Sequence, residues 1–219
     1  MTITFRNRTE AGKLLAQKLK AYANLSDVIV LALPRGGVPV GFEIAKALNV
    51  PLDVCVVRKL GIPHHPELAM GAIASNGVRV LNYDILSEWN IPDKIIDKVS
   101  AKELRELRRR EHSYRDNLPV IDVINRTVII VDDGIATGST MRAVIALMRQ
   151  QNPKQVIVAV PVAPYSVYKE LQAEVDKLVC LTMPEPFYAV GLWYENFPQT
   201  SDEQVHKLLE KFTAMTNAA

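Results

Sequence analysis

The sequence predicts an α/β fold, in which a doubly wound and mainly parallel sheet carries helices on both faces. Apolar runs rich in Val and Ile alternate with segments of helical periodicity, which is typical of successive βα units. Val28–Leu33 and Thr127–Val131 are almost wholly apolar, as strands buried on both faces of a sheet are. In such folds, ligands bind beyond the carboxyl ends of the strands.

The first third of the chain supplies a helix and two strands before its pattern becomes irregular. Thr9–Tyr22 places leucines on one side of a helix. Val28–Leu33 leads into a second helix, whose apolar face follows Gly37, and Leu52–Val57 is the next strand. Arg58–Glu67 shows no periodicity, so an irregular segment is expected there.

The remaining elements follow from turn residues and periodicity. Leu68–Ser75 and Val78–Leu81 are expected to pair as a hairpin, because the intervening Asn76–Gly77 is a favoured two-residue turn. Pro92 suits the first turn of a long helix that reaches about Tyr114. An apolar stripe at i, i+3, i+4 and i+7 predicts a helix after the strand Thr127–Val131: Met141, Val144, Ile145 and Met148. Further strands are expected at Gln155–Val160 and Lys177–Leu181, with helices at Tyr165–Ala173 and Asp202–Phe212.

Composition narrows the function classes. The 219 residues are 48% hydrophobic, which is enough for a well-developed core. The net charge of +2 gives no global case for binding nucleic acid or an anionic membrane. No apolar run approaches the roughly 18 residues that span a bilayer, and the first residues lack the apolar stretch of a secretory signal. A cytoplasmic protein is therefore expected, with Cys55 and Cys180 as reduced core thiols.

The sharpest motif lies between the strand Thr127–Val131 and the helix that follows. Gly134–Thr140 is a loop of small and hydroxylic residues at a helix start, where backbone N–H groups and the helix dipole favour an anion. A phosphate monoester suits such a loop, and three hydroxyls could add hydrogen bonds: Thr137, Ser139 and Thr140. The nucleoside triphosphate P-loop is a poor match, because no Gly-Lys-Ser/Thr ending is present.

Two carboxylates, Asp132 and Asp133, precede this loop. They would repel a phosphate, whereas adjacent ribose hydroxyls can donate charge-assisted hydrogen bonds to them. The pattern therefore indicates a sugar phosphate. The alternative is an acidic N-cap after a buried strand, for which one aspartate would suffice.

At these residues the chain resembles the type I phosphoribosyltransferases, whose signature is a strand, two acidic residues, a short stretch containing apolar residues and Thr-Gly-x-Thr. The resemblance spans about residues 25–185 and implies binding of 5-phosphoribosyl 1-diphosphate. On that model Asp132 and Asp133 hold the ribose, and the 5′-phosphate lies against Gly134 and the residues from Ala136 through Thr137, Gly138, Ser139 and Thr140. A wider pattern that includes Leu33–Pro39 and Gly191–Tyr194 resembles a bacterial subgroup of predicted phosphoribosyltransferases, which supplies no substrate.

The resemblance also implies one domain over residues 1–219, with 184–219 as a C-terminal hood or tail, and a homodimer. In the hood, Phe187, Trp193 and Tyr194 could stack on a base, although packing in the core is the preferred interpretation. Ala136 stands where family members that act on 6-oxopurines often have an acidic residue, which argues against that subclass.

A second loop with anion-binding features is Pro34-Arg35-Gly36-Gly37, which looks like the family's diphosphate loop and its common strained or cis peptide. Gly36 and Gly37 let backbone N–H groups approach an anion, and Arg35 can bind oxygens in a bidentate manner. Arg58 and Lys59 are expected at the end of the next strand, where they could neutralise a diphosphate and its Mg²⁺. No firm protein ligand for the metal is expected.

The segment Gly61–Glu67 occupies the place of the family's flexible flap. His64, His65 and Glu67 are candidates for proton transfer, with His65 and Glu67 preferred; an exposed polar loop is the alternative.

The sequence predicts transfer of phosphoribose from 5-phosphoribosyl 1-diphosphate to a nitrogenous base or amine, or the reverse reaction. Two alternatives remain. A regulator of the same fold could sense a nucleotide and contact RNA through the basic face Arg105–Arg110, which is otherwise a solvated face with helical ion pairs. A hydrolase could release phosphate or a base from a sugar phosphate.

Overall fold

A computed structural model describes residues 4–74, 76–115 and 122–217. Its centre is a five-stranded parallel sheet in the order β2-β1-β6-β7-β8. The strands are β1 (Val28–Ala32), β2 (Leu52–Val54), β6 (Thr127–Val131), β7 (Gln155–Val162) and β8 (Lys177–Thr182). β1 and β6 are buried along their whole length, which explains their continuous apolar sequences.

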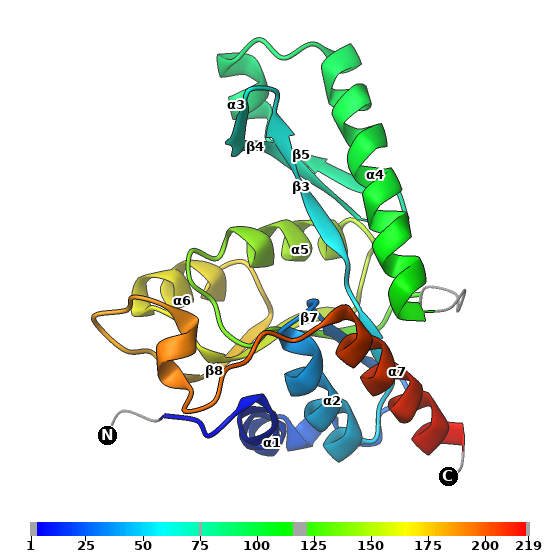
Figure 1. Cartoon of the computed structure of the whole chain (residues 1–219), viewed down its shortest axis with the longest axis vertical. Helices are drawn as coiled ribbons and strands as arrows, with labels where there is room; N and C mark the ends of the chain where they lie inside the picture. Colours follow the sequence, from blue (N-terminus) through cyan, green and yellow to red (C-terminus); the bar gives the residue numbers. More distant parts are fainter. Residues whose placement is uncertain (1–3, 75, 116–121, 218–219) are drawn as a thin grey trace.

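Helices cover both faces of this sheet, so the predicted doubly wound architecture is confirmed (Figure 1). On one face, α1 (Arg8–Lys18), α2 (Gly37–Leu48) and α7 (Asp202–Asn217) pack against side chains such as Ile129. On the other face, the expected stripe of α5 (Ser139–Arg149) packs against Ile130, and α6 (Tyr165–Gln172) lies beside it. A short 3-10 turn, Lys20–Tyr22, extends α1.

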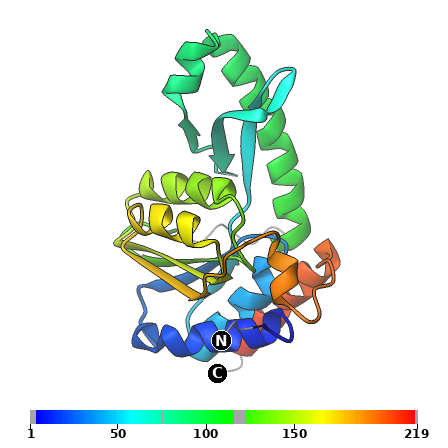
Figure 2. The same cartoon turned by 90° about the vertical axis from the view of Figure 1, so that its left-hand side faces the viewer.

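A second group of elements projects from the central sheet as an arm, which was not predicted from the sequence (Figures 1 and 2). It contains an antiparallel sheet in the order β3-β4-β5 and two helices. Its elements are β3 (Val57–Ile62), β4 (His65–Ala74), β5 (Arg79–Leu81), α3 (Tyr83–Glu88) and α4 (Asp93–Arg115). The arm places one end of α4 near α7 and the central sheet (Figure 1).

In and beside the arm, the expected hairpin and the long helix now seen as α4 are confirmed, and two other expectations are wrong. β4 and β5 pair antiparallel across a turn in which Gly77 has φ +85°, as the Asn76–Gly77 pattern predicted. The strand expected over Leu52–Val57 ends at Val54, because the chain leaves the central sheet there. The irregular segment expected over Arg58–Glu67 is instead part of the β3–β4 hairpin.

The C-terminal segment before α7 packs an aromatic cluster against the N-terminus, around the 3-10 turn η2 (Val190–Trp193). The rings of Phe5 and Tyr194 lie 5.4 Å apart, and both side chains are buried. Phe187 and Trp193 pack against the same cluster, so the core interpretation of these aromatic residues is confirmed. Among the described residues, no helix is long and apolar enough to cross a membrane.

Candidate functional site

The loop between β6 and α5 has the shape of an anion-binding turn. Gly138 adopts a left-handed conformation with φ +75° and caps α5, which begins at Ser139. Within the described chain, the backbone N–H groups of Ala136, Thr137 and Gly138 donate no hydrogen bond to protein. Ala136 and Thr137 are exposed and Gly138 is buried, so the N–H groups of the first two are open to a ligand beside the helix start.

The side chains around this turn stabilise its shape. The hydroxyls of Thr137 and Ser139 lie 3.2 Å apart. Arg142 Nη1 donates to the backbone oxygen of Thr137 at 3.2 Å, and its guanidinium is ion-paired with Glu170 and Glu174 of the α6 region. The guanidinium of Arg142 thus fixes the turn from α5, a contribution that the sequence analysis missed.

Asp133 carries an ion pair that local sequence does not reveal. Arg8 of α1 approaches the single oxygen Oδ2 through Nε and Nη2, each at 2.8 Å. Both side chains are largely buried, with 10% of Arg8 and 15% of Asp133 exposed. Tyr194 Oη also donates to the Asp133 backbone oxygen at 2.6 Å. Asp133 therefore has a structural role, and its expected contact with ribose stays a prediction.

Asp132 lies next to this pair in a partly buried position. Its Oδ1 accepts the backbone N–H of Asp133 at 2.8 Å. Burial raises the pKa of Asp132, and the charge of the Asp133 carboxylate raises it further. Burial also raises the pKa of Asp133, but the Arg8 guanidinium opposes that effect.

The Pro34–Gly37 loop packs directly on these carboxylates. The Pro34–Arg35 peptide is cis, in agreement with the expectation for this loop. A Cβ added to Gly36 would lie 1.9 Å from Asp133 Oδ2, and one added to Gly37 would lie 2.6 Å from the Val131 backbone oxygen. Glycine is thus required at both positions for the two loops to touch.

Both loops border a cavity of about 420 Å³, which lies beyond the carboxyl ends of β1 and β2. Arg35 from the first loop and Thr140 from the second both line it. Cys55, expected as a core thiol, is buried and also lines this cavity. The other lining residues come from the segments that follow β1 and β2, from the start of β3, and from α4 and α7: Leu33, Pro34, Val56, Val57, Arg109, Arg110, Tyr114 and Asp202.

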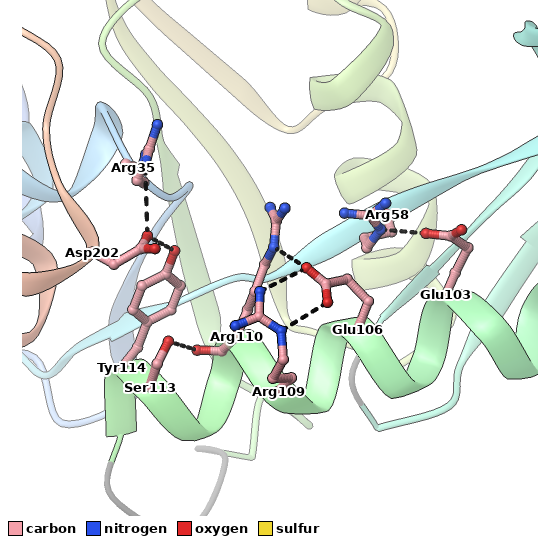
Figure 3. Close-up of polar contacts among 9 residues, drawn as sticks. All are labelled: Arg35, Arg58, Glu103, Glu106, Arg109, Arg110, Ser113, Tyr114 and Asp202. Carbon is pink, nitrogen blue, oxygen red and sulfur yellow. Dashed lines mark hydrogen bonds and ion pairs between the residues drawn. The ribbon is translucent and has the colours of Figure 1, made fainter.

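The α4 and α7 side chains around this cavity form a polar network (Figure 3). Tyr114 Oη donates to Asp202 Oδ1 at 2.7 Å, and the same oxygen lies 3.8 Å from Arg35 Nη1. Burial and this hydrogen bond raise the pKa of Tyr114 to about 12, so its hydroxyl remains a donor at neutral pH. Arg109 and Arg110 are exposed and pair with Glu106 along the helix, as expected for a solvated face, but their position beside this cavity was not predicted.

Arg58 and Lys59 do not lie where they were expected. They belong to β3 of the arm, so the expectation that they close a strand of the central sheet is wrong. Arg58 forms an ion pair with Glu103 of α4. Lys59 lines a second cavity, of about 750 Å³, between the arm and α5, which Ser139 and Thr140 also line.

The candidate proton-transfer residues lie in the β3–β4 hairpin. His64 is in the turn with φ +68°, and the His65 ring lies 4.9 Å from that of Trp89. This turn is at the end of the arm remote from the central sheet (Figures 1 and 2). Neither histidine lines the two cavities beside Thr140. The side chain of Glu67 lies outside the described part of the structure.

Comparison with known proteins places the chain in a family. The model of the phosphoribosyl transferase domain matches residues 6–192. Proteins in two strains of Mycobacterium tuberculosis, provisionally named as phosphoribosyl transferases, are 46% identical over 94% of this chain and 46% of their own length. The chain thus spans about half the length of these curated relatives.

Solved structures agree with the sequence comparison. The protein TT1426 from Thermus thermophilus is 38% identical with a TM-score of 0.86, over 96% of this chain and 99% of that one. A hypoxanthine-guanine phosphoribosyltransferase from Bacillus anthracis is 12% identical with a TM-score of 0.50, over 91% and 95% of the two chains, and shares the fold. The chain therefore belongs to the phosphoribosyl transferase domain family.

Proposed function

We propose that this protein binds 5-phosphoribosyl 1-diphosphate with Mg²⁺ and transfers phosphoribose to a nitrogenous base or amine, or catalyses the reverse reaction. The observation that carries the proposal is the cavity of about 420 Å³ that is lined by both Arg35 and Thr140. These residues belong to two separate loops, each with anion-binding features.

The proposal gives each loop one part of the substrate. The 5′-phosphate would accept hydrogen bonds from the backbone N–H groups of Ala136–Gly138 and the hydroxyls that follow them. The diphosphate would lie against Pro34–Gly37, where Arg35 supplies charge. Asp132 would accept a ribose hydroxyl, and Asp133 would be held beside it by Arg8. Arg58 and Lys59, now placed on β3, are secondary candidates for neutralising the diphosphate.

In the reaction, the bond between the ribose anomeric carbon and the diphosphate oxygen breaks, and a nitrogen of the acceptor forms the new bond. The oxygen keeps the electron pair of the broken bond, so the ribose carbon becomes oxocarbenium-like as the nitrogen approaches. The acceptor nitrogen gives up its proton to water or to a base as the new bond forms. The protein contributes by orienting the phosphoribosyl group and stabilising charge on the leaving diphosphate. Proton transfer by His65 or Glu67 stays a prediction.

A Mg²⁺ ion would fit this arrangement through the substrate. No cluster of three or more His, Cys, Asp or Glu residues that could hold a metal is present in the described part of the chain. Asp202 is the one carboxylate among the described residues that line the smaller cavity. Such a wall suits a Mg²⁺ ion held mainly by phosphate oxygens and water, which neutralises charge on the diphosphate. We further propose a cytoplasmic homodimer, supported by the resemblance to the type I enzymes.

Product analysis tests the proposal. The protein is incubated with 5-phosphoribosyl 1-diphosphate, Mg²⁺ and a panel of bases and amines, and products are identified by mass spectrometry. Transfer predicts a nucleotide and an equal amount of diphosphate. Asp132→Asn should lower substrate affinity by about tenfold or more, because one hydrogen bond to a charged group is weakened. Free ribose 5-phosphate in place of a nucleotide would show a hydrolase instead. Binding without any product would favour a regulator.

A further inference from the structure

The wall of the smaller cavity that faces Arg35 and Thr140 comes from the arm, through α4. Arg109 and Arg110, near the C-terminal end of α4, line the cavity together with Arg35. Figure 3 shows these arginines between the Arg35 loop and β3. Among the described residues, the cavity is therefore lined by three guanidinium groups and one carboxylate, that of Asp202. This excess of positive charge suits an anion with several negative charges.

Each of these guanidinium groups has an acidic partner. Glu106 accepts from Arg109 at 2.9 Å through Nε and 3.0 Å through Nη2, and from Arg110 Nε at 2.9 Å. Asp202 Oδ1 lies 3.8 Å from Arg35 Nη1, beyond hydrogen-bonding distance. The acids hold the guanidinium groups in place but leave donors unused.

Arg110 has more donors available than Arg109. Its terminal nitrogens, Nη1 and Nη2, form no hydrogen bond with the described residues, because Glu106 contacts only Nε. In Figure 3 these two nitrogens point away from α4. A guanidinium with two parallel N–H donors matches two oxygens of a phosphate group.

We propose that Arg109 and Arg110 of α4 complete the diphosphate-binding subsite opposite Arg35, and that Glu106 and Asp202 hold the arginines in the absence of the anion. This inference rests on the proposed function and adds to it the side of the cavity that would select for a diphosphate group. It also explains the position of the arm, whose helix α4 supplies charge that the central sheet does not.

The same geometry predicts competition at Arg35 and Glu106. A diphosphate oxygen that approaches Arg35 must either displace Asp202 or share the Arg35 guanidinium with it. Asp202 is itself held by a 2.7 Å hydrogen bond from Tyr114. A diphosphate oxygen that approaches Arg109 or Arg110 must likewise compete with the Glu106 carboxylate. Removing the charge of Glu106 should therefore strengthen diphosphate binding, although the arginines lose a partner.

Calorimetric titration with two separate probes, inorganic diphosphate and ribose 5-phosphate, tests the inference on the full chain with Mg²⁺. The double variant Arg109→Gln/Arg110→Gln should bind diphosphate at least about tenfold more weakly and ribose 5-phosphate within about twofold of the wild type. The matched control is Arg105→Gln/Arg108→Gln, which removes the same charge from two exposed arginines of the same helix that do not line the cavity. This control should change diphosphate affinity by less than about threefold, an effect that added salt removes.

The outcomes separate the two proposals. If the wild type binds both probes and the Arg109/Arg110 variant binds diphosphate as tightly as the control does, the inference is overturned and the proposed function stands. If the wild type binds neither probe, both are overturned. If circular dichroism shows that the double variant does not fold, the single variants Arg110→Gln and Glu106→Gln test the inference instead. Weaker diphosphate binding by Arg110→Gln and tighter binding by Glu106→Gln support it. Unchanged affinities in both variants contradict it.

Discussion

At the scale of single residues, the Asp132–Asp133 pair shows two different environments for adjacent carboxylates. The sequence predicted the motif and its position after β6, and both are present in the structure. It could not predict the partner of Asp133, because Arg8 lies 125 residues away and approaches only through the packing of α1. The motif therefore identified the loop, whereas tertiary contacts determine what each carboxylate can bind.

The Arg8–Asp133 pair should be important for stability. Arg8→Met leaves the Asp133 carboxylate largely buried without its cation and removes a hydrogen bond to the Pro198 backbone oxygen. We expect a loss of about 1–3 kcal/mol in the free energy of unfolding, measured by urea denaturation. Arg6→Met is the matched control: its side chain is 75% exposed and pairs with Glu10 at the surface, so it should cost less than about 1 kcal/mol. Equal effects of the two substitutions would contradict the assignment.

Asp132 should make stability depend on pH. Burial raises its pKa in the folded state, so the folded protein binds more protons than the unfolded chain above the ordinary value of 3.8. Stability contributed by protonated Asp132 is thus lost as pH rises from about 4 toward the raised pKa. In Asp132→Asn this loss is absent, and the stability of the variant relative to wild type should increase with pH over that range. Urea denaturation at several pH values measures the difference; parallel curves would count against the raised pKa.

At the scale of elements, the segments that follow most directly from the sequence are those that fold from their own local pattern. The strand–loop–helix unit of β6 and α5, the long helix α4 and the β4–β5 turn follow from apolar runs, periodicity and turn residues. β3 was missed because its strand character comes from pairing with β4, while Gly61, Pro63 and the basic pair Arg58–Lys59 read locally as a loop. Its departure from the central sheet after Val54 depends on tertiary packing.

The contact between the β1–α2 loop and the β6–α5 loop can be tested at Gly36. Gly36→Ala would place a Cβ 1.9 Å from Asp133 Oδ2, so one of the loops must shift. We expect about 1–3 kcal/mol of destabilisation and weaker binding of 5-phosphoribosyl 1-diphosphate, measured by thermal unfolding and calorimetry. Gly77→Ala provides the comparison, because its Cβ would meet nothing within 4 Å while its φ of +85° costs about 1–2 kcal/mol. That variant should lose stability without losing affinity; a loss of affinity in both would remove the specific link to the site.

At the scale of the whole molecule, the candidate site lies where the arm meets the carboxyl ends of the central strands. Helical periodicity predicted ion pairs along α4, and those of Glu106 with Arg109 and Arg110 are present. It could not predict that this turn of α4 faces Arg35, because that orientation depends on how the arm is placed. The positions of the two loops could thus be predicted from the sequence, whereas the α4 residues that line the same cavity could not.

The proposed function depends above all on the Gly134–Thr140 turn holding a phosphate monoester through backbone N–H groups. Titrating the ¹⁵N-labelled protein with ribose 5-phosphate, while recording amide correlation spectra, tests it most directly, and ribose without phosphate is the control. We expect saturable downfield shifts of the amide protons of Ala136, Thr137 and Gly138 with ribose 5-phosphate and none with ribose. Amide signals of these residues that stay unchanged at saturating ribose 5-phosphate would contradict it.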